Sequence, residues 1–268
     1  MKKERVDVLL VEQGFFDSRE KAKRAIMAGI IHNDHEILDK PGTKIPIDTP
    51  LYVKGETLKY VSRGGLKLEK ALQYFDINLN GKIMLDIGSS TGGFTDCALQ
   101  NGASRVYALD VGTNQLVWKL RNDKRVTVME QTNFRYATLD MFNEGQPNFV
   151  SIDVSFISLK LIFQPLSSII QPFGDVIALI KPQFEAGRDQ VGKHGIVKDS
   201  TVHLEVIRNV VNYAKEYGFT LVNLTFSPIT GGEGNIEFLG HFKKDDSIPS
   251  CSIDFNEVVE QAHNTFQK

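Results

Sequence analysis

From residue 82 onward, short apolar segments alternate with segments of helical periodicity, and this alternation limits the fold more than any other feature of the chain. Five apolar runs have the length of buried strands, and they span residues 83–87, 105–110, 126–129, 149–154 and 175–180. Their continuous apolar character is typical of parallel strands that are covered on both faces. Helical patterns separate or follow them, at residues 94–101, 114–121, 159–170 and 200–216.

Two further strands are predicted at 219–226 and 236–242, with the glycine-rich turn 230–235 between them. Together these elements predict an α/β fold, a Rossmann-like domain built on a mostly parallel seven-stranded sheet. Ligands of such open sheets bind above the carboxyl ends of the strands. The polar, glycine-containing stretch 184–198 is expected to form a mobile loop over that edge.

The first 59 residues follow a different pattern, which predicts a smaller α/β domain. A first apolar helical stripe stops at Gly14, since glycine readily adopts the left-handed conformation found after helix ends. A second helix is expected to begin at Asp17, which has capping-box spacing to Glu20, and to end at Gly29. The basic side chains of that helix are Arg19, Lys21, Lys23 and Arg24.

The net charge of −2 hides an uneven distribution along the chain. Residues 1–70 hold 14 Lys/Arg against 11 Asp/Glu, a balance of +3, and the remainder holds 17 against 22, a balance of −5. A basic module on a mildly acidic body is typical of an RNA-directed enzyme. A cationic helix face alone is more often just a solvated surface, so charge is supporting evidence here.

Three segments are predicted: a domain at 1–59, a linker at 60–65 and a second domain at 66–268. The paired glycines Gly64 and Gly65 are expected to loosen the linker. The two cysteines have no nearby partner and the six histidines show no ligand spacing, so neither a disulfide framework nor a metal site is expected. No apolar run is long enough for a membrane helix and no signal-peptide core follows the N-terminus, so we expect a cytoplasmic protein.

The motif Leu85-Asp86-Ile87-Gly88-Ser89-Ser90-Thr91-Gly92-Gly93-Phe94-Thr95 follows a predicted strand and opens a helix, as a nucleotide-binding turn does. Its glycines are spaced G-x-x-x-G-G rather than G-x-G-x-x-G, and an acid precedes them. A carboxylate there would repel a pyrophosphate but can accept a hydrogen bond from the cationic methionine part of S-adenosylmethionine (SAM). SAM is therefore favoured over a dinucleotide. The residues expected to bind it are Asp86, Gly88, Ser89, Ser90, Gly92, Gly93, Phe94, Asp110, Val111 and Asn133. Asp110 is expected on the ribose hydroxyls, and either Asn133 or Phe134 near the adenine.

Charged residues mark the ends of several apolar strands. Asp153 ends the fourth strand, Lys181 ends the fifth, and Glu237 lies in the last. Lys67 comes from the helix that enters the second domain. Neighbouring strands lie about 5 Å apart, so the four side chains can meet above the sheet. The alternative is a pair of surface ion pairs, each worth under ~1 kcal/mol.

These residues carry two resemblances. The pattern Arg5-Val6-Asp7-x-Leu9-Leu10, Ser18-Arg19-x-x-Ala22 and Ile26-x-x-Gly29 resembles the S-four-type RNA-binding domain over about residues 4–58. The order Lys67–Asp153–Lys181–Glu237 resembles the tetrad of FtsJ/RrmJ-like ribose 2′-O-methyltransferases. With the surrounding motifs 61–68, 108–112, 153–158, 179–185 and 227–238, the chain is similar to the TlyA, or hemolysin A, family over nearly its whole length.

The resemblance implies a SAM-dependent enzyme that methylates a ribose 2′-OH of ribosomal RNA, with ribosomal RNA or subunits as its partner. The tetrad residues are then catalytic, and Arg5, Arg19, Lys21, Lys23, Arg24 and Arg63 contact RNA. Lys181 is expected to meet the 2′-OH, either as a base or as a cation that stabilises the developing alkoxide. Asp153 and Glu237 would orient the two lysines.

Three other functions are alternatives to this one. An RNA-binding, ribosome-associated factor without turnover would keep this fold, although the intact tetrad speaks against it. A membrane-active hemolysin is disfavoured because no transmembrane run or strongly amphipathic basic helix is visible. An NAD-dependent oxidoreductase is disfavoured by the glycine spacing.

Overall fold

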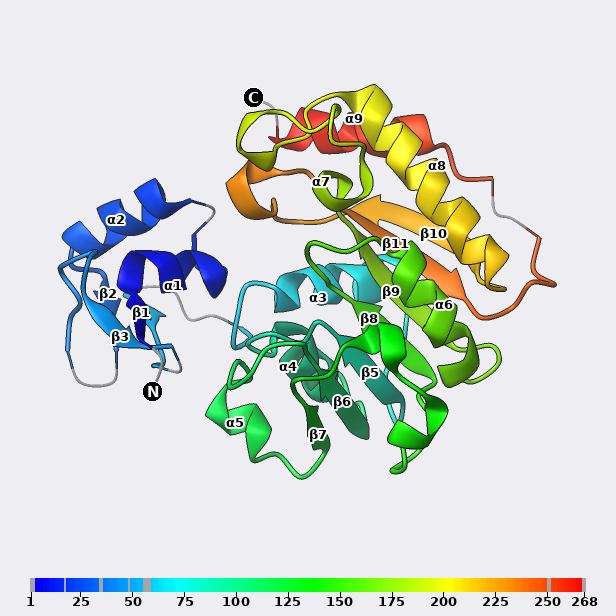
Figure 1. Ribbon diagram of the computed structural model, residues 1–268, viewed down its shortest axis with the longest axis horizontal. Helices are drawn as coiled ribbons and strands as arrows, with labels where there is room; N and C mark the ends of the chain where they lie inside the picture. The colour runs from blue at the N-terminus through cyan, green and yellow to red at the C-terminus, as the bar shows by residue number, and fades with distance from the viewer. Residues whose placement is uncertain are drawn as a thin grey trace.

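The computed structural model describes residues 3–16, 18–33, 36–47, 49–54, 59–249 and 252–266. The chain forms a small N-terminal domain and a larger α/β domain, which lie side by side and are joined by the segment that precedes α3 (Gly65–Tyr74) (Figure 1).

The N-terminal domain packs two helices on short antiparallel strand pairs. Strand β1 (Lys3–Arg5) pairs with β3 (Lys44–Pro46), and β2 (Ile31–His32) pairs with β4 (Tyr52–Val53). Helices α1 (Val6–Glu12) and α2 (Arg19–Met27) close over them and bury one apolar cluster. That cluster contains Val6, Leu9, Leu10, Ala22, Ile26 and Ile31.

The ends of these helices follow local signals in the sequence. Gly14 adopts a positive φ of 77° after α1, as expected of a glycine stop. Ser18 caps α2, because its hydroxyl accepts a hydrogen bond from the Lys21 N–H at 3.4 Å. Asp17, which the capping-box prediction invoked, lies outside the described residues.

The larger domain is a seven-stranded sheet in the order β10-β11-β9-β8-β5-β6-β7. Five strands run parallel, namely β5 (Ile83–Ile87), β6 (Arg105–Leu109), β7 (Val126–Met129), β8 (Phe149–Ile152) and β9 (Asp175–Ile180). Strand β11 (Phe238–Lys243) is antiparallel to β9 and pairs in turn with β10 (Thr220–Phe226). This confirms the predicted Rossmann-like, mostly parallel sheet.

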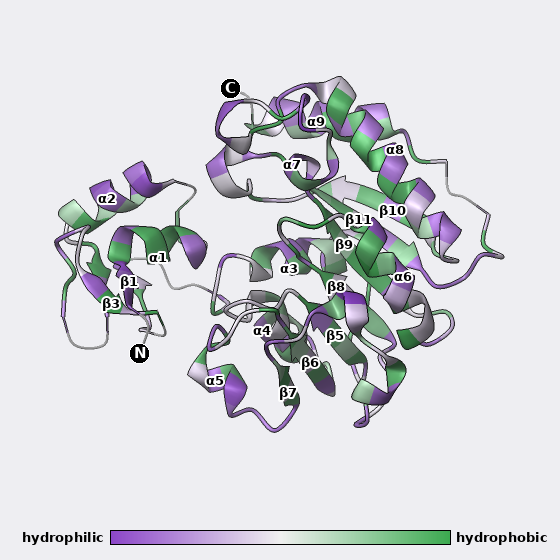
Figure 2. Ribbon diagram, viewed as in Figure 1, coloured by the Kyte–Doolittle hydropathy of each residue, from purple (hydrophilic) through white to green (hydrophobic). Residues whose placement is uncertain are grey.

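Helices cover both faces of the sheet, which is why its strands are mostly apolar (Figure 2). Helices α3, α4 (Gly93–Gln100) and α5 (Trp118–Arg121) pack on one face. Helices α6 (Lys160–Ile169), α8 (Ser200–Glu216) and α9 (Phe255–Phe266) pack on the other. Short helical turns complete the chain: η1 (Phe134–Tyr136), η2 (Leu139–Met141), α7 (Pro182–Glu185), η3 (Lys193–Gly195) and η4 (Gly232–Gly234).

Two expectations need correction. The helix predicted at 114–121 spans only α5, because the Glu130 carboxylate accepts the backbone N–H groups of Asn114, Gln115 and Leu116 and holds them in a turn. The linker is also packed rather than loose. Tyr60 is buried and donates its hydroxyl to Glu69 at 2.9 Å, and the Val61 N–H donates to Asp96 at 2.9 Å.

Candidate active site

The four tetrad residues come from four separate elements and meet at the carboxyl edge of the sheet. Lys67 lies in the first turns of α3, and Asp153 directly follows β8. Lys181 directly follows β9, and Glu237 directly precedes β11 rather than lying inside that strand. Since β8 and β9 are parallel neighbours, and β11 is antiparallel to β9, the residues after β8 and β9 and before β11 fall at the same edge.

The four charges form one continuous chain of ion pairs. The Lys67 Nζ lies 2.8 Å from Glu237 Oε2 and 3.8 Å from Asp153 Oδ2. The Lys181 Nζ lies 2.5 Å from Asp153 Oδ1. Asp153 therefore bridges the two lysines, and the two cations balance the two carboxylates. The surface-pair alternative does not fit, because Glu237 is only 2% exposed and the lysine side chains only 10% exposed.

Burial and pairing fix the charge states of two members of this tetrad. Burial alone would lower the pKa of Lys67, but the carboxylates of Asp153 and Glu237 outweigh burial and raise the pKa above the usual lysine value. Burial likewise opposes ionisation of Asp153, yet Lys181 and Lys67 hold the pKa of its carboxyl below the ordinary range. At neutral pH Lys67 is thus a cation and Asp153 an anion.

Two neighbours of the tetrad were not among the predicted site residues. The Lys181 Nζ donates to the Ser155 hydroxyl at 3.3 Å. The Gln183 amide donates to Glu237 Oε1 at 3.2 Å, while its own oxygen Oε1 is buried without a hydrogen-bond partner among the described residues. Both residues belong to strand-end motifs, Asp153–Ser158 and Lys181–Glu185, so their place in those motifs was the available signal.

The glycine-rich loop between β5 and α4 brings the backbone close to the end of β8. Gly88 has a φ of 86°, and a Cβ there would lie 2.2 Å from the carbonyl oxygen of Asp153. Gly92 has a φ of 101° at the start of α4, and a Cβ on Gly93 would lie 2.3 Å from the Ser62 hydroxyl. Only glycine permits this crowding, as expected of a loop whose backbone approaches a ligand.

Asp86 lies beneath this loop. It is fully buried, and its two oxygens accept hydrogen bonds from the hydroxyls of Thr95 at 2.7 Å and Ser151 at 2.8 Å. Burial raises the pKa of its carboxyl to about 7, against the lowering effect of those hydrogen bonds. The structure thus places Asp86 as a support of the loop, and its predicted direct contact with SAM stays a prediction.

A cavity of about 370 Å³ lies beside the loop, above the ends of β5, β6 and β8. Its lining includes Gly88, Ser90, Asp110, Val111 and Asn133 from the predicted cofactor set, together with the buried ring of Phe134. Asp110 accepts the Ser90 N–H and the Gly112 N–H, both at 2.8 Å, so its carboxylate is held at the cavity wall. Ser89, Gly93 and Phe94 line a different cavity.

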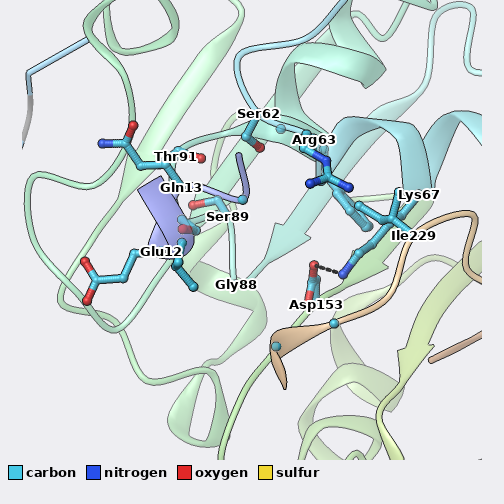
Figure 3. A pocket seen from close by; sticks show the side chains of 18 of the residues that line it. Glu12, Gln13, Ser62, Arg63, Lys67, Gly88, Ser89, Thr91, Asp153 and Ile229 are labelled. Carbon is cyan, nitrogen blue, oxygen red and sulfur yellow. Dashed lines mark ion pairs between the residues drawn. The ribbon is translucent and has the colours of Figure 1, made fainter. Parts of the chain in front are cut away.

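That second cavity, of about 190 Å³, connects the tetrad to the N-terminal domain (Figure 3). Lys67 and Asp153 form part of its wall, and the end of α1 faces them. Arg63 also lines it and donates to the Phe15 carbonyl of the N-terminal domain at 3.1 Å. Asp153 lines both cavities, whereas Lys181 lines neither of them.

The predicted RNA-binding residues fall into two groups. Arg5 and Arg19 both bind the fully buried carboxylate of Asp7, at 2.8 and 2.9 Å, and so lie side by side. Lys21, Lys23 and Arg24 lie on the surface of α2 with Arg19, and Lys23 pairs with Glu20 at 3.0 Å. Arg63 is separate from them, at the catalytic cavity. Asp7 lies in the motif that carries the S-four-type resemblance but was not predicted as a site residue, because its pairing with Arg19 spans twelve positions of the sequence.

Two family models match different parts of this chain. A family model described as FtsJ-like methyltransferase matches residues 60–244, and a model described as S4 domain matches residues 4–48. A Bacillus subtilis protein named as an rRNA methyltransferase, YqxC, is 58% identical over 273 residues, which cover 100% of this chain and 96% of that protein.

Two further relatives extend the comparison. The 16S/23S rRNA (cytidine-2′-O)-methyltransferase TlyA of Mycobacterium tuberculosis is 40% identical over 235 residues, 87% of each chain. A solved structure named as a hemolysin of Streptococcus thermophilus superimposes with a TM-score of 0.90 at 58% identity, covering 100% of this chain and 98% of that one.

The fold and the site define the class, a methyltransferase built on a Rossmann-like sheet. Within that class the chain belongs to the FtsJ-like methyltransferase family, in the branch of the TlyA, or hemolysin A, proteins. The predicted family is thereby confirmed. Among the described residues, no helix has both the length and the apolar composition needed to cross a bilayer.

Proposed function

We propose that this chain transfers the methyl group of SAM to a ribose 2′-OH of ribosomal RNA. The observation that carries the proposal is the chain of ion pairs that links Lys67, Glu237, Asp153 and Lys181 at the edge of two cavities. One cavity has the features of a nucleoside-binding site, and the other opens toward an S4 domain. Such a substrate would place the enzyme in the cytoplasm.

The residues around the first cavity fit SAM. Glycine at position 88 lets the loop pack against the carbonyl oxygen of Asp153 at the cavity wall, and the carboxylate of Asp110 suits ribose hydroxyls. Val111 and Phe134 supply apolar surface for an adenine, and Asn133 supplies an amide. SAM, when bound, supplies a methyl group that is already activated as a sulfonium. The protein then has to orient the acceptor and manage its proton.

The tetrad is suited to that task. Lys67 stays cationic between Glu237 and Asp153 and so provides a fixed positive charge. Asp153 holds the Lys181 ammonium in one orientation at 2.5 Å. We assign Lys181 to the 2′-OH, where it either accepts the proton or stabilises the developing negative charge on oxygen. The 2′-OH also explains the choice of RNA over DNA.

The S4 domain supplies the contact with RNA. Arg5 and Arg19 each use only part of their guanidinium on Asp7, and their side chains remain 39% and 51% exposed. The remaining N–H groups are available for phosphate oxygens. Contacts of this kind provide affinity and register rather than base recognition. The names of the relatives point to cytidines of 16S and 23S rRNA, and we extend ribosomal RNA as the substrate to this chain.

Transfer of a tritiated methyl group from SAM to ribosomal subunits of a strain that lacks this protein tests the proposal. We expect label in rRNA, at a phosphodiester that resists alkaline cleavage because the 2′-OH is blocked. Lys181→Ala should abolish transfer and leave SAM affinity within a few-fold. Lys215→Ala, on the exposed side of α8, is the matched control and should retain activity.

Other outcomes would contradict the proposal. SAM binding without transfer to either subunit would favour a ribosome-associated factor that has no turnover. Alkaline cleavage of the phosphodiester next to the labelled nucleotide, or label on a base, would exclude the ribose 2′-OH as the acceptor. Near-normal activity of Lys181→Ala would remove the role assigned to that lysine.

A further inference from the structure

A third cavity lies between the two domains and is distinct from the two cavities at the tetrad. It is about 690 Å³ in volume. One wall comes from the N-terminal domain, including Phe15, Leu51 and Tyr52. The other wall comes from the segment 114–121, which contains α5. We refer to this cavity as the interdomain cleft.

Two aromatic side chains are exposed in this cleft from opposite walls. Trp118, the single tryptophan of the chain, is 75% exposed at the start of α5. Tyr52 is 42% exposed, and its ring stacks on His32 with a centroid distance of 5.3 Å. Tryptophan is usually well buried, so an exposed indole in a cavity indicates a surface that receives a partner.

The segment that carries Trp118 is held firmly in place. Glu130 accepts the N–H groups of residues 114–116 and pairs with Arg121 at 2.5 Å. The Val117 N–H donates to the Thr91 carbonyl of the glycine-rich loop at 3.2 Å. The indole is thus presented on a fixed support that is attached to the cofactor loop.

The lining of the cleft carries two cations, Lys119 and Arg121, and the lining residues that the structure describes include no carboxylate. Each cation pairs with a carboxylate outside the lining, Lys119 with Asp96 at 3.6 Å and Arg121 with Glu130 at 2.5 Å. The Lys119 side chain is nevertheless 73% exposed, so its ammonium can also meet a phosphate. The amides of Asn114 and Gln115 add hydrogen-bonding groups that can meet base edges. Aromatic faces combined with cations and amides are the chemistry by which proteins hold unpaired nucleotides.

The cleft shares wall residues with both cavities of the site. Gln13 and Thr91 line the cleft and the catalytic cavity, and Gln115 lines the cleft and the cavity assigned to SAM. The cleft therefore lies next to the catalytic cavity, as the binding of two neighbouring nucleotides of one RNA strand requires.

We propose that the interdomain cleft binds an unpaired nucleotide of the RNA substrate next to the one that is methylated, with its base stacked on Trp118 and bounded by Tyr52. This inference rests on the proposed function, since it takes RNA as the substrate. The contact does not involve the reacting ribose, so it acts on RNA affinity and positioning.

The single tryptophan makes the test direct. In the full-length protein, a single-stranded RNA dodecamer should quench the emission of Trp118, and blunt double-stranded RNA of equal length should quench it far less. Trp118→Ala should raise the Kd for protein-free rRNA about tenfold, which is the effect of losing one stacked base. Trp118→Phe should restore most of the affinity, and Tyr52→Ala should weaken binding several-fold.

Phe173→Ala is the matched control, because Phe173 is 69% exposed but precedes β9 at the opposite edge of the sheet. It should leave the Kd for rRNA unchanged, and Trp118→Ala should leave SAM affinity unchanged. Unchanged Trp118 emission at saturating RNA, together with a Kd of Trp118→Ala within twofold of wild type, would overturn the inference and leave the proposed function intact.

Two other results would assign the cleft to a different occupant. Quenching by SAM alone would assign the cleft to the cofactor, and concentration-dependent self-association that Trp118→Ala abolishes would assign it to a second copy of the chain. Each would overturn the RNA assignment. Absence of any rRNA binding by the wild-type protein would overturn both this inference and the proposed function.

Discussion

Buried ionisable side chains at this site carry out two different tasks. In the tetrad, each member has an oppositely charged partner within 3.8 Å, and this pairing keeps Lys67 cationic and Asp153 anionic despite burial. Asp86, beneath the glycine-rich loop, has only hydroxyl partners, and burial raises the pKa of its carboxyl to about 7. Substitutions at these positions should therefore change stability in opposite directions.

Asp86→Asn should stabilise the protein at alkaline pH. The pKa of Asp86 is near 3.8 in the unfolded chain and about 7 in the folded one, so stability falls as pH rises through that interval. Asparagine removes the free-energy cost of ionising this buried carboxyl, which is at most about 4 kcal/mol. Urea unfolding at pH 5 and pH 8 should show a smaller loss of stability between the two values in Asp86→Asn than in wild type. An equal loss in both proteins would contradict the shifted pKa.

Lys67→Met should be strongly destabilising, because it leaves Glu237 buried without its cation. A loss of about 3–5 kcal/mol in unfolding free energy is expected for a broken buried pair. The double variant Lys67→Met with Glu237→Gln removes the stranded charge and should recover much of that stability while remaining inactive. A double-mutant cycle in urea measures the coupling, and additive losses would show that the two residues do not interact.

At the scale of elements, the C-terminal helix is tied to the loop that precedes α8. His203 of α8 is fully buried, with one ring nitrogen 2.9 Å from His263 of α9 and the other 3.2 Å from the Val197 carbonyl. Asn235 holds the same loop by accepting the Val197 N–H at 3.0 Å and donating to the Gly195 carbonyl at 2.9 Å. The stretch predicted as a mobile loop is thus anchored at its end.

Acidification should weaken this anchor. Burial, together with His263, lowers the pKa of His203 to about 4, against about 6.5 in the unfolded chain. The unfolded state therefore binds the proton first, and stability is lost as pH falls from about 6.5 to 4, by at most about 3 kcal/mol. Thermal melts at pH 7.5 and pH 5 should show a smaller acid shift in His203→Gln than in wild type. His194→Gln, on the exposed part of the loop, should behave as wild type does.

How far the sequence predicts these elements depends on whether the deciding contact is local. Strands β5, β7 and β9 match their predicted bounds, because an apolar run between turns needs no further information. Helix α5 is shorter than predicted because Glu130, from beyond β7, takes the N–H groups of its first predicted turn. The tetrad could be predicted because charged residues follow apolar strands in the sequence. The contacts of Asp7 with Arg19 and of Gln183 with Glu237 could not, because they depend on packing between separate segments.

At the scale of the whole molecule, the two domains contribute different parts of the proposed RNA contact. The exposed cations of α2 lie on the N-terminal domain, and the tetrad lies on the methyltransferase domain. The domain bounds 1–59 and 66–268, with a joint at 60–65, remain our proposal for where these two parts divide.

The α2 surface should set the salt dependence of RNA binding. Arg19→Ala combined with Lys23→Ala removes two cations and should lower the slope of log K against log salt by up to about 2. Filter binding of labelled rRNA at salt concentrations of roughly 50 to 200 mM checks this expectation. Lys160→Ala with Lys215→Ala removes two cations from α6 and α8 and serves as the control. Equal slopes for wild type and the α2 variant would exclude that surface.

The packed joint has a consequence for where methylation falls. Tyr60 is buried against Glu69, Val61 is bonded to Asp96, and Arg63 reaches back to the Phe15 carbonyl, so both sides of the joint are fastened. Under the proposed function, this fixed joint sets the distance between the phosphates that the N-terminal domain binds and the ribose that is methylated. Insertion of a few residues into the joint should shift the methylated position, or spread methylation over neighbouring nucleotides, without abolishing methyl transfer.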